Sequence, residues 1–210
     1  LHTREINNAS KLQTIHYSYD PLIDIQKIPR IKPISIRNLN LVTIGRLVPQ
    51  KNYPFLFQAL SLVSQKQINF TLTILGEGKL EKELVQQALD LNLSKNIIWA
   101  GKTKDIQRIM NSSDALIMSS LYEGFGLVVL EAIQLGLPVI APKRSTFPEV
   151  LGSDYPGLFE AESKEEMARL ISDLKVPAFI SKLSKASISR QSFFTAKKMV
   201  EAILDFYEGK

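Results

Sequence analysis

The chain has 210 residues, of which 45% are hydrophobic and 22% charged, and its formal net charge is +5. This ordinary globular composition allows a sizeable core in one large domain, and no apolar run approaches the ~20 residues that a membrane-spanning helix needs. The absence of cysteine excludes disulfides and thiolate metal sites, and two isolated histidines offer no spacing for a metal cluster.

The first 38 residues are predicted to form a linker with one small element, because they contain three prolines and one short apolar patch, Leu12 to Tyr17. Residues 1–50 hold seven basic against three acidic side chains. Four of the basic residues lie in a segment without acids: Lys27, Arg30, Lys32 and Arg37. A solvated linker is the favoured interpretation, with anionic lipid headgroups or a phosphorylated substrate as the alternative. No aromatic side chains interleave with these cations, so no nucleic-acid platform is expected.

From residue 39 onward, short apolar runs alternate with segments of helical period. Strands are predicted at Leu39–Gly45, Phe70–Gly76, Ile97–Gly101, Ala115–Ser119 and Val139–Ala141. Helices are predicted between them at Pro54–Gln65, Leu80–Leu91, Asp105–Met110 and Leu127–Leu135. This order predicts an α/β fold, a Rossmann-like doubly wound parallel sheet covered by helices on both faces. After about Phe159 only helices are predicted, at Lys164–Leu174, Ala178–Ser187 and Ala196–Tyr207.

Four polar or glycine-containing turns come directly after predicted strands. They are Gly45-Arg46, Gly76-Glu77-Gly78, Gly101-Lys102 and Glu123-Gly124. Because the carboxyl ends of parallel strands meet at one edge of the sheet, these turns are expected to surround a single ligand site.

The segment from Glu123 to Glu131 is the strongest candidate for chemistry. It reads as a strand end, a Gly-Phe-Gly turn and the start of a helix, and helix N-termini present unpaired N–H groups to anions. Glu123 lies nearest the strand edge, where it could contact a transferred group. Glu131, on the helix, could accept hydrogen bonds from both ribose hydroxyls. Two carboxylates also allow an acid and base interpretation of the glycosidase type, which is ranked lower.

Two cations, Arg46 and Lys51, follow the first strand, and Asn52 is predicted to cap the next helix. An arginine fork and a compact ammonium suit a diphosphate, with a solvated turn as the alternative. The glycines at 76 and 78 match neither a complete dinucleotide fingerprint nor a Walker loop. Trp99 is expected in the core rather than on a base, as are Met110 and Met118.

Taken in order, these motifs resemble a known family. The match covers about residues 39–160 and includes Gly45-Arg46 with Lys51-Asn52, Leu75-Gly76-Glu77-Gly78, Trp99-Ala100-Gly101, Ser119 through Ala132 and Gly136 through Val150. It is similar to the nucleotide-binding C-terminal half of the retaining GT-B glycosyltransferases of group 1. The sequence is therefore expected to form one half of a GT-B fold, with C-terminal helices.

The resemblance implies a role for each candidate residue. Glu123 would be the catalytic carboxylate at the donor sugar, and Glu131 would bind the ribose. The donor diphosphate would be bound by Arg46, Lys51, Gly124, Phe125, Gly126 and Leu127. The nucleobase would lie close to Gly76, Lys102 and Thr103. The donor would be a UDP-sugar or a GDP-sugar, and the family needs no metal or other cofactor.

The resemblance also implies how the chain is organised. Residues 1–38 would be the interdomain crossover, residues 39–192 the nucleotide-sugar-binding domain, and residues 193–210 a helix that packs on a missing N-terminal domain. That missing domain would bind a glycan or lipid-linked acceptor, so this fragment alone is expected to be inactive. The parent enzyme would work in bacterial surface glycan or lipopolysaccharide synthesis, in the cytoplasm or peripherally at the inner membrane face.

Other functions remain open on the sequence alone. A sugar-nucleotide epimerase would need carboxylates from two domains, and a phosphorylase would need a pyridoxal lysine motif, which is not found. A catalytically silent sugar-nucleotide-binding module is the alternative from another class. The presence of Arg46, Lys51, Glu123 and Glu131 argues against this alternative, because a silent module would not need both a diphosphate clamp and a sugar contact.

Overall fold

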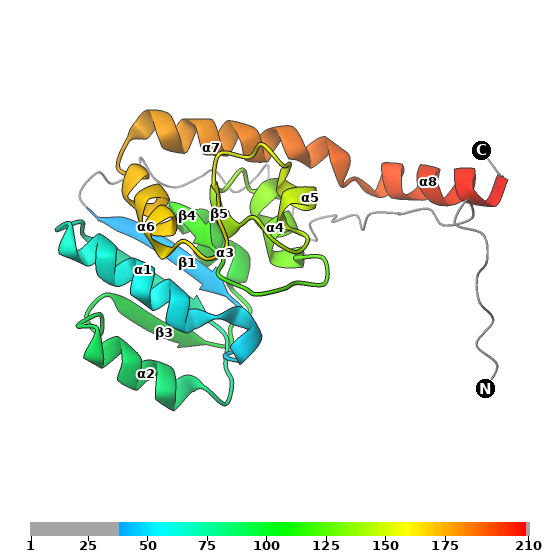
Figure 1. Cartoon of the computed structure of the whole chain (residues 1–210). Coiled ribbons are helices and arrows are strands. Elements are labelled where there is room, and N and C mark those ends of the chain that lie inside the picture. Colours follow the sequence, from blue (N-terminus) through cyan, green and yellow to red (C-terminus); the bar gives the residue numbers. More distant parts are fainter. Residues whose placement is uncertain (1–37, 209–210) are drawn as a thin grey trace.

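The computed structural model describes residues 38–208, which fold around a six-stranded parallel sheet of order β3-β2-β1-β4-β5-β6 (Figure 1). The strands are β1 (Leu39–Ile44), β2 (Phe70–Leu75), β3 (Ile97–Gly101), β4 (Ala115–Ile117), β5 (Val139–Pro142) and β6 (Leu158–Phe159). The order reverses between β1 and β4, which places a topological switch point at the centre of the sheet. The Rossmann-like fold predicted for one half of a GT-B enzyme is confirmed.

Helices cover both faces of this sheet. They are α1 (Tyr53–Gln65), α2 (Glu81–Asp90), α3 (Ile106–Ser112), α4 (Leu127–Gln134), α5 (Phe147–Leu151), α6 (Lys164–Asp173), α7 (Pro177–Arg190) and α8 (Ala196–Glu208). Two short 3-10 turns, η3 (Pro49–Lys51) and η4 (Gln191–Phe193), complete the set. Helix α1 packs against α2 and α6 on the near side of the sheet, whereas α4 packs against α5 and α7 (Figure 1). The chain thus has the three layers that a doubly wound fold requires.

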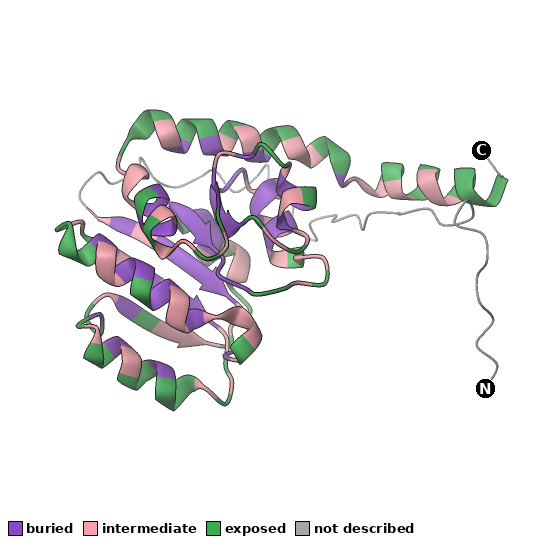
Figure 2. Ribbon diagram, viewed as in Figure 1, coloured by how far each residue is buried: buried purple, intermediate pink, exposed green. Residues whose placement is uncertain are grey.

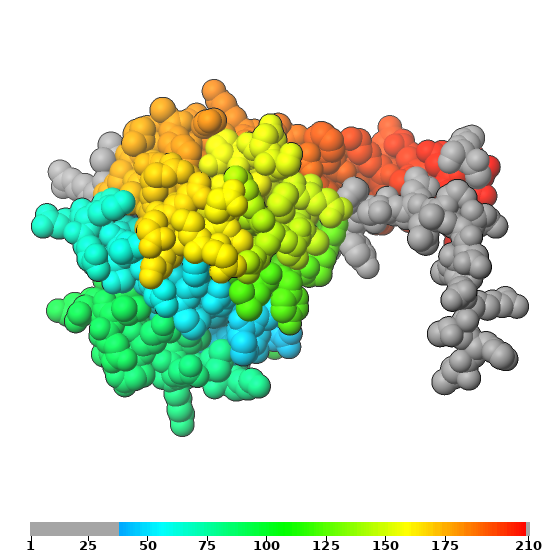
Figure 3. Space-filling view, viewed as in Figure 1, coloured from blue at the N-terminus to red at the C-terminus, as the bar shows by residue number. Residues whose placement is uncertain are grey.

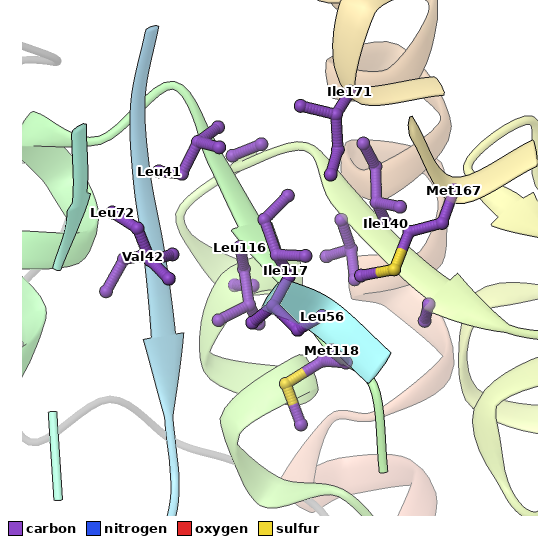
Figure 4. Close-up of a cluster of buried hydrophobic side chains, with 14 of the residues drawn as sticks. Leu41, Val42, Leu56, Leu72, Leu116, Ile117, Met118, Ile140, Met167 and Ile171 are labelled. Atoms are coloured by element: carbon purple, nitrogen blue, oxygen red, sulfur yellow. The ribbon is translucent and has the colours of Figure 1, made fainter. Parts of the chain in front are cut away.

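The core lies between the sheet and these helices, and the central strands are buried on both faces (Figure 2). Leu41 of β1, Ile117 of β4 and Leu56 of α1 belong to the buried cluster drawn in Figure 4. Continuous apolar strands are the expected pattern for a parallel sheet with two covered faces. Met110 and Met118, predicted as core residues, are 0% and 2% exposed.

Trp99 of β3 is half-buried and packs against the core. Its ring meets that of Phe57 edge to face, with ring centroids 6.2 Å apart and an angle of 84° between the planes. Such a pair is a favourable aromatic geometry. The prediction that Trp99 serves packing is confirmed.

Two elements were missed by the sequence analysis, α5 and β6, and several boundaries differ from the predicted ones. Helix α5 has five residues and β6 two, which is too short for either hydrophobic period to be recognised. Helix α7 runs past the predicted end at Ser187 to Arg190, and β4 ends before the predicted Ser119. These differences leave the order of the elements unchanged.

Helix α8 stands apart from the rest of the described chain. It projects from the body of the molecule (Figure 3), and none of its residues is buried. Its apolar residues that are exposed include Val200, Leu204, Phe206 and Tyr207. The division at residues 192 and 193 stays a prediction, and the predicted linker with its four basic residues lies outside the described residues. Between residues 38 and 208, no helix has the length and apolar character that a membrane crossing demands.

Candidate functional site

The candidate site lies where β1 and β4 run side by side at the switch point. Leu41 pairs with Ala115 and Val42 with Leu116, so the loops that follow these strands emerge next to each other. Since all six strands are parallel, the four turns singled out in the sequence share the carboxyl edge, as predicted. This edge is where doubly wound sheets hold their ligands.

The centre of the site is an ion pair between the loops after β1 and β4. Lys51 Nζ lies 2.6 Å from Glu123 Oε1, and the two side chains are only 16% and 11% exposed. Three further hydrogen bonds join the same loops. The Gln50 side-chain amide donates to the Tyr122 carbonyl oxygen at 2.8 Å, and the Leu121 N–H donates to the Gln50 carbonyl oxygen at 2.8 Å. The Ser119 hydroxyl donates to the Lys51 carbonyl oxygen at 2.7 Å. The charged pair is therefore rigidly supported and largely shielded from water.

Arg46, in contrast, is exposed in the turn directly after β1. Its guanidinium has no ion-pair partner among the described residues. A guanidinium offers several N–H donors in one plane, a geometry that fits phosphate oxygens. Arg46 is thus free to bind an anion at the edge of the sheet.

Glu131 lies in the second turn of α4, and burial raises the pKa of its carboxyl above the ordinary value of 4.5. The part of the chain that the structure describes supplies no hydrogen-bond donor to this carboxylate. A half-buried carboxylate without donors is unfavourable when charged. Hydroxyl donors from a ligand would relieve that cost.

The glycine turn between Glu123 and α4 is open to a ligand. A Cβ added at Gly124 would meet no atom within 4 Å. Gly126 has a φ of 75°, a left-handed conformation that suits glycine, and no side chain caps the helix that begins at Leu127. Phe125 packs edge to face on Phe194, with ring centroids 6.0 Å apart. The first N–H groups of α4 thus lie beside an accessible turn.

The three residues predicted near the nucleobase lie together on the β2 and β3 side of the edge. Gly76 N–H donates to the Gly101 carbonyl oxygen at 2.8 Å, and the Glu77 carboxylate accepts from the Lys102 N–H at 3.3 Å. The Thr103 hydroxyl accepts from the Asp105 N–H at 3.1 Å. A Cβ at Gly76 would collide with the Gly45 carbonyl, so the turns after β1 and β2 touch only because Gly76 has no side chain.

The structure thus joins some of the predicted residues and leaves others apart. Lys51 and Glu123 are in direct contact, and Gly76 lies beside the loop of Lys102 and Thr103. Within residues 38–208, no hydrogen bond or ion pair links Glu131 to Lys51 or Glu123. Their separate roles toward a ligand stay predictions.

Asn52 lies at the predicted N-cap position of α1, whereas Ser145 was missed by the sequence analysis. Asn52 does occupy the position before α1, but its side chain makes no capping hydrogen bond; it adopts a left-handed φ of 50° instead. Ser145, in the loop after β5, hydrogen-bonds both backbone groups of Glu123. Applied to the predicted strand Val139–Ala141, the rule that predicted the other turns would have drawn attention to the polar loop that contains Ser145, though not to Ser145 itself.

The fold and the edge site define a class of protein, a doubly wound α/β domain that carries its ligand site at the carboxyl ends of its strands. The chain belongs to the glycosyl transferases group 1 family, whose model matches residues 24–176. The resemblance noted in the sequence is thereby confirmed.

Individual relatives agree with this family. An uncharacterized glycosyltransferase of Methanocaldococcus jannaschii is 32% identical over 150 residues, which are 70% of this chain and 37% of the relative. The UDP-Gal:alpha-D-GlcNAc-diphosphoundecaprenol alpha-1,3-galactosyltransferase of Escherichia coli is 29% identical over 171 residues, 78% of this chain and 44% of the relative. The chain therefore spans less than half the length of these relatives.

A solved structure shows the same fold. The crystal structure of S. aureus TarM in complex with UDP, fondaparinux and alpha-GlcNAc-glycerol superimposes with a TM-score of 0.73 at 25% identity. The match covers 80% of this chain and 35% of TarM. The described domain thus corresponds to one part of TarM.

Proposed function

We propose that this chain is the donor-binding half of a retaining glycosyltransferase, which moves a sugar from a UDP-sugar or GDP-sugar to a hydroxyl acceptor. The observation that carries the proposal is the paired Lys51 and Glu123 at the switch point of the sheet, next to the free cation of Arg46. Cations there suit a diphosphate, and a carboxylate beside them suits the sugar attached to it.

Each group would act on a different part of the donor. Arg46, Lys51 and the N–H groups around Gly124 to Leu127 would neutralise the diphosphate, where negative charge builds up as it leaves. Glu123 would offset positive charge that develops at the anomeric carbon. Glu131 would accept from the ribose hydroxyls, which supply the donors that its carboxylate lacks.

Retention of the anomeric configuration is expected, because the diphosphate would leave and the acceptor hydroxyl would attack on the same face of the sugar. The acceptor would be held by a domain outside this chain. The name of the E. coli relative specifies UDP-Gal and a diphosphoundecaprenol-linked GlcNAc. This supports a lipid-linked or glycan acceptor here and a place in surface glycan synthesis at the cytoplasmic membrane face. An inverted product anomer from the full-length enzyme would refute the retaining mechanism.

Calorimetric titration with UDP, GDP and ADP tests the donor site directly. We expect one of these diphosphates to bind the 210-residue chain with one-to-one stoichiometry and to identify the base. Inorganic phosphate serves as the control for non-specific attraction to the cations. If none of the diphosphates binds either this chain or the full-length enzyme at millimolar concentration, the proposed function is wrong.

Replacing Glu131 with glutamine should stabilise the folded chain at neutral pH. Burial raises the pKa of Glu131, so the folded carboxyl holds its proton to a higher pH than the unfolded one, and wild type loses stability as pH rises from 4.5 through the raised pKa. Glutamine does not ionise and avoids this loss. Melting temperatures measured from pH 4 to 7 should show the advantage of Glu131→Gln growing with pH.

The same variant should bind its diphosphate more weakly than wild type, because a neutral amide accepts hydroxyl hydrogen bonds less strongly than a carboxylate. Glu201→Gln, at an exposed position within α8, is the matched control and should change neither property appreciably, because its ion pair with Lys197 is exposed. A stability difference that does not vary with pH would contradict the role of burial.

A further inference from the structure

Ser145, in the loop between β5 and α5, binds both backbone groups of one residue, Glu123. The Glu123 N–H donates to Ser145 Oγ at 3.0 Å, and the same hydroxyl donates to the Glu123 carbonyl oxygen at 3.1 Å. A single side chain thus satisfies one donor and one acceptor of the candidate catalytic residue. This pair of bonds restricts the orientation of the Glu123 backbone.

The backbone of Ser145 is in an unusual conformation. Its φ is 54°, in the left-handed region that residues with a Cβ seldom adopt. The two preceding residues form ion pairs with acidic residues that follow β6: Lys143 Nζ lies 2.7 Å from Glu160 Oε1, and Arg144 pairs with Glu162. Strained residues persist where their surroundings hold them, and they gather at functional sites.

Glu123 is therefore held from both neighbouring strands, since β4 lies between β1 and β5. On the β1 side, Lys51 binds its carboxylate; on the β5 side, Ser145 binds its backbone. The hydroxyl oxygen of Thr146 lies 4.0 Å from the point where a Cβ on Gly126 would sit, so this loop also borders the far end of the glycine turn. Gly124, between these supports, remains open.

We infer that Ser145 is a positioning residue for the donor sugar: its hydroxyl sets the orientation of Glu123 and so determines how well the sugar is bound, without contributing to diphosphate binding. The inference rests on the proposed function, because it takes Glu123 as the sugar contact. The Lys51 ammonium and the Arg46 guanidinium come from the loop after β1, which has no hydrogen bond to Ser145 among the described residues.

Two substitutions separate this role from a merely structural one. Ser145→Ala removes the hydroxyl and keeps the strained backbone, whereas Ser145→Gly removes the hydroxyl and favours a left-handed φ. Ser145→Gly should therefore melt at a higher temperature than Ser145→Ala. Ser94→Gly, an exposed serine that precedes β3 at the opposite edge of the sheet, is the matched control.

The measurement is the gain in affinity that a sugar adds to a nucleoside diphosphate. Each variant is titrated with UDP, UDP-glucose, UDP-galactose and UDP-N-acetylglucosamine, and with GDP and GDP-mannose. We expect both Ser145 variants to bind the bare diphosphate within about twofold of wild type, while the gain from the preferred sugar falls at least about fivefold. If both variants lose the affinity gained from the sugar, although their melting temperatures differ, the loss is due to the missing hydroxyl and not to a change in stability.

Four results would overturn the inference. If Ser145→Gly keeps the full sugar gain, or if both variants lose diphosphate and sugar affinity equally, Ser145 does not position Glu123, and the proposed function stands. If wild type binds a diphosphate but gains nothing from any sugar, the role of Glu123 fails and this inference with it. If none of the probes binds either this chain or the full-length enzyme, both the inference and the proposed donor site are wrong.

Discussion

Replacing Glu123 with glutamine is expected to reduce sugar transfer by the full-length enzyme about a hundredfold or more, without weakening diphosphate binding. Glutamine keeps the shape of the side chain but removes the negative charge that would offset the developing positive charge at the anomeric carbon. It also releases Lys51 from an ion pair of 2.6 Å, so the ammonium is more available to phosphate oxygens. The turnover number with the preferred nucleotide sugar and the calorimetric affinity for its diphosphate measure the two effects.

This divergence between turnover and affinity is what distinguishes a sugar-facing carboxylate from a structural one. Asp173→Asn, which removes one partner of an exposed ion pair with Arg169 in α6, serves as the control and should leave turnover within about twofold, because exposed pairs contribute little. If Glu123→Gln retains more than a third of wild-type turnover, or loses diphosphate affinity in proportion, Glu123 is not the catalytic carboxylate.

Replacing Lys51 with alanine is expected to weaken diphosphate binding by about tenfold to a hundredfold, the effect of losing one charge-assisted hydrogen bond. The change removes a cation and also exposes the diphosphate to the charge of Glu123, whose side chain is only 11% exposed. Because that carboxylate would be left without its partner, the free energy of unfolding should fall by roughly 1–3 kcal/mol. Calorimetry and urea denaturation give the two quantities.

The double variant Lys51→Ala with Glu123→Gln tests whether these losses come from the missing cation or from the unpaired carboxylate. It should recover most of the lost stability, since no unpaired charge remains, but only part of the lost diphosphate affinity, since the cation is still missing. Lys66→Ala, exposed at the end of α1, controls for net charge. Full recovery of affinity in the double variant would mean that Lys51 serves only to neutralise Glu123.

Much of the fold could be predicted because its signals are local. The apolar runs that became β1 to β5 and the helical periods that became α1 to α4 are properties of neighbouring residues, and parallel strands must end at one edge. The short elements α5 and β6 carry no such period and were missed. The position of Asn52 was right, but whether its side chain would form the cap depended on the path of the chain after η3.

The features of the candidate site likewise fall into those that the sequence determined and those that only the tertiary structure decided. The sequence alone determined the βα order, the edge at which Arg46, Lys51 and Glu123 gather, and the family, because residue type and spacing carry that information. Only the tertiary structure decided that Lys51 and Glu123, 72 positions apart, form a shielded ion pair, and that Ser145, 22 positions from Glu123, holds its backbone. Burial likewise raised the pKa of Glu131. Such pairings and burial depend on how distant loops pack against each other, and spacing along the chain does not specify that packing.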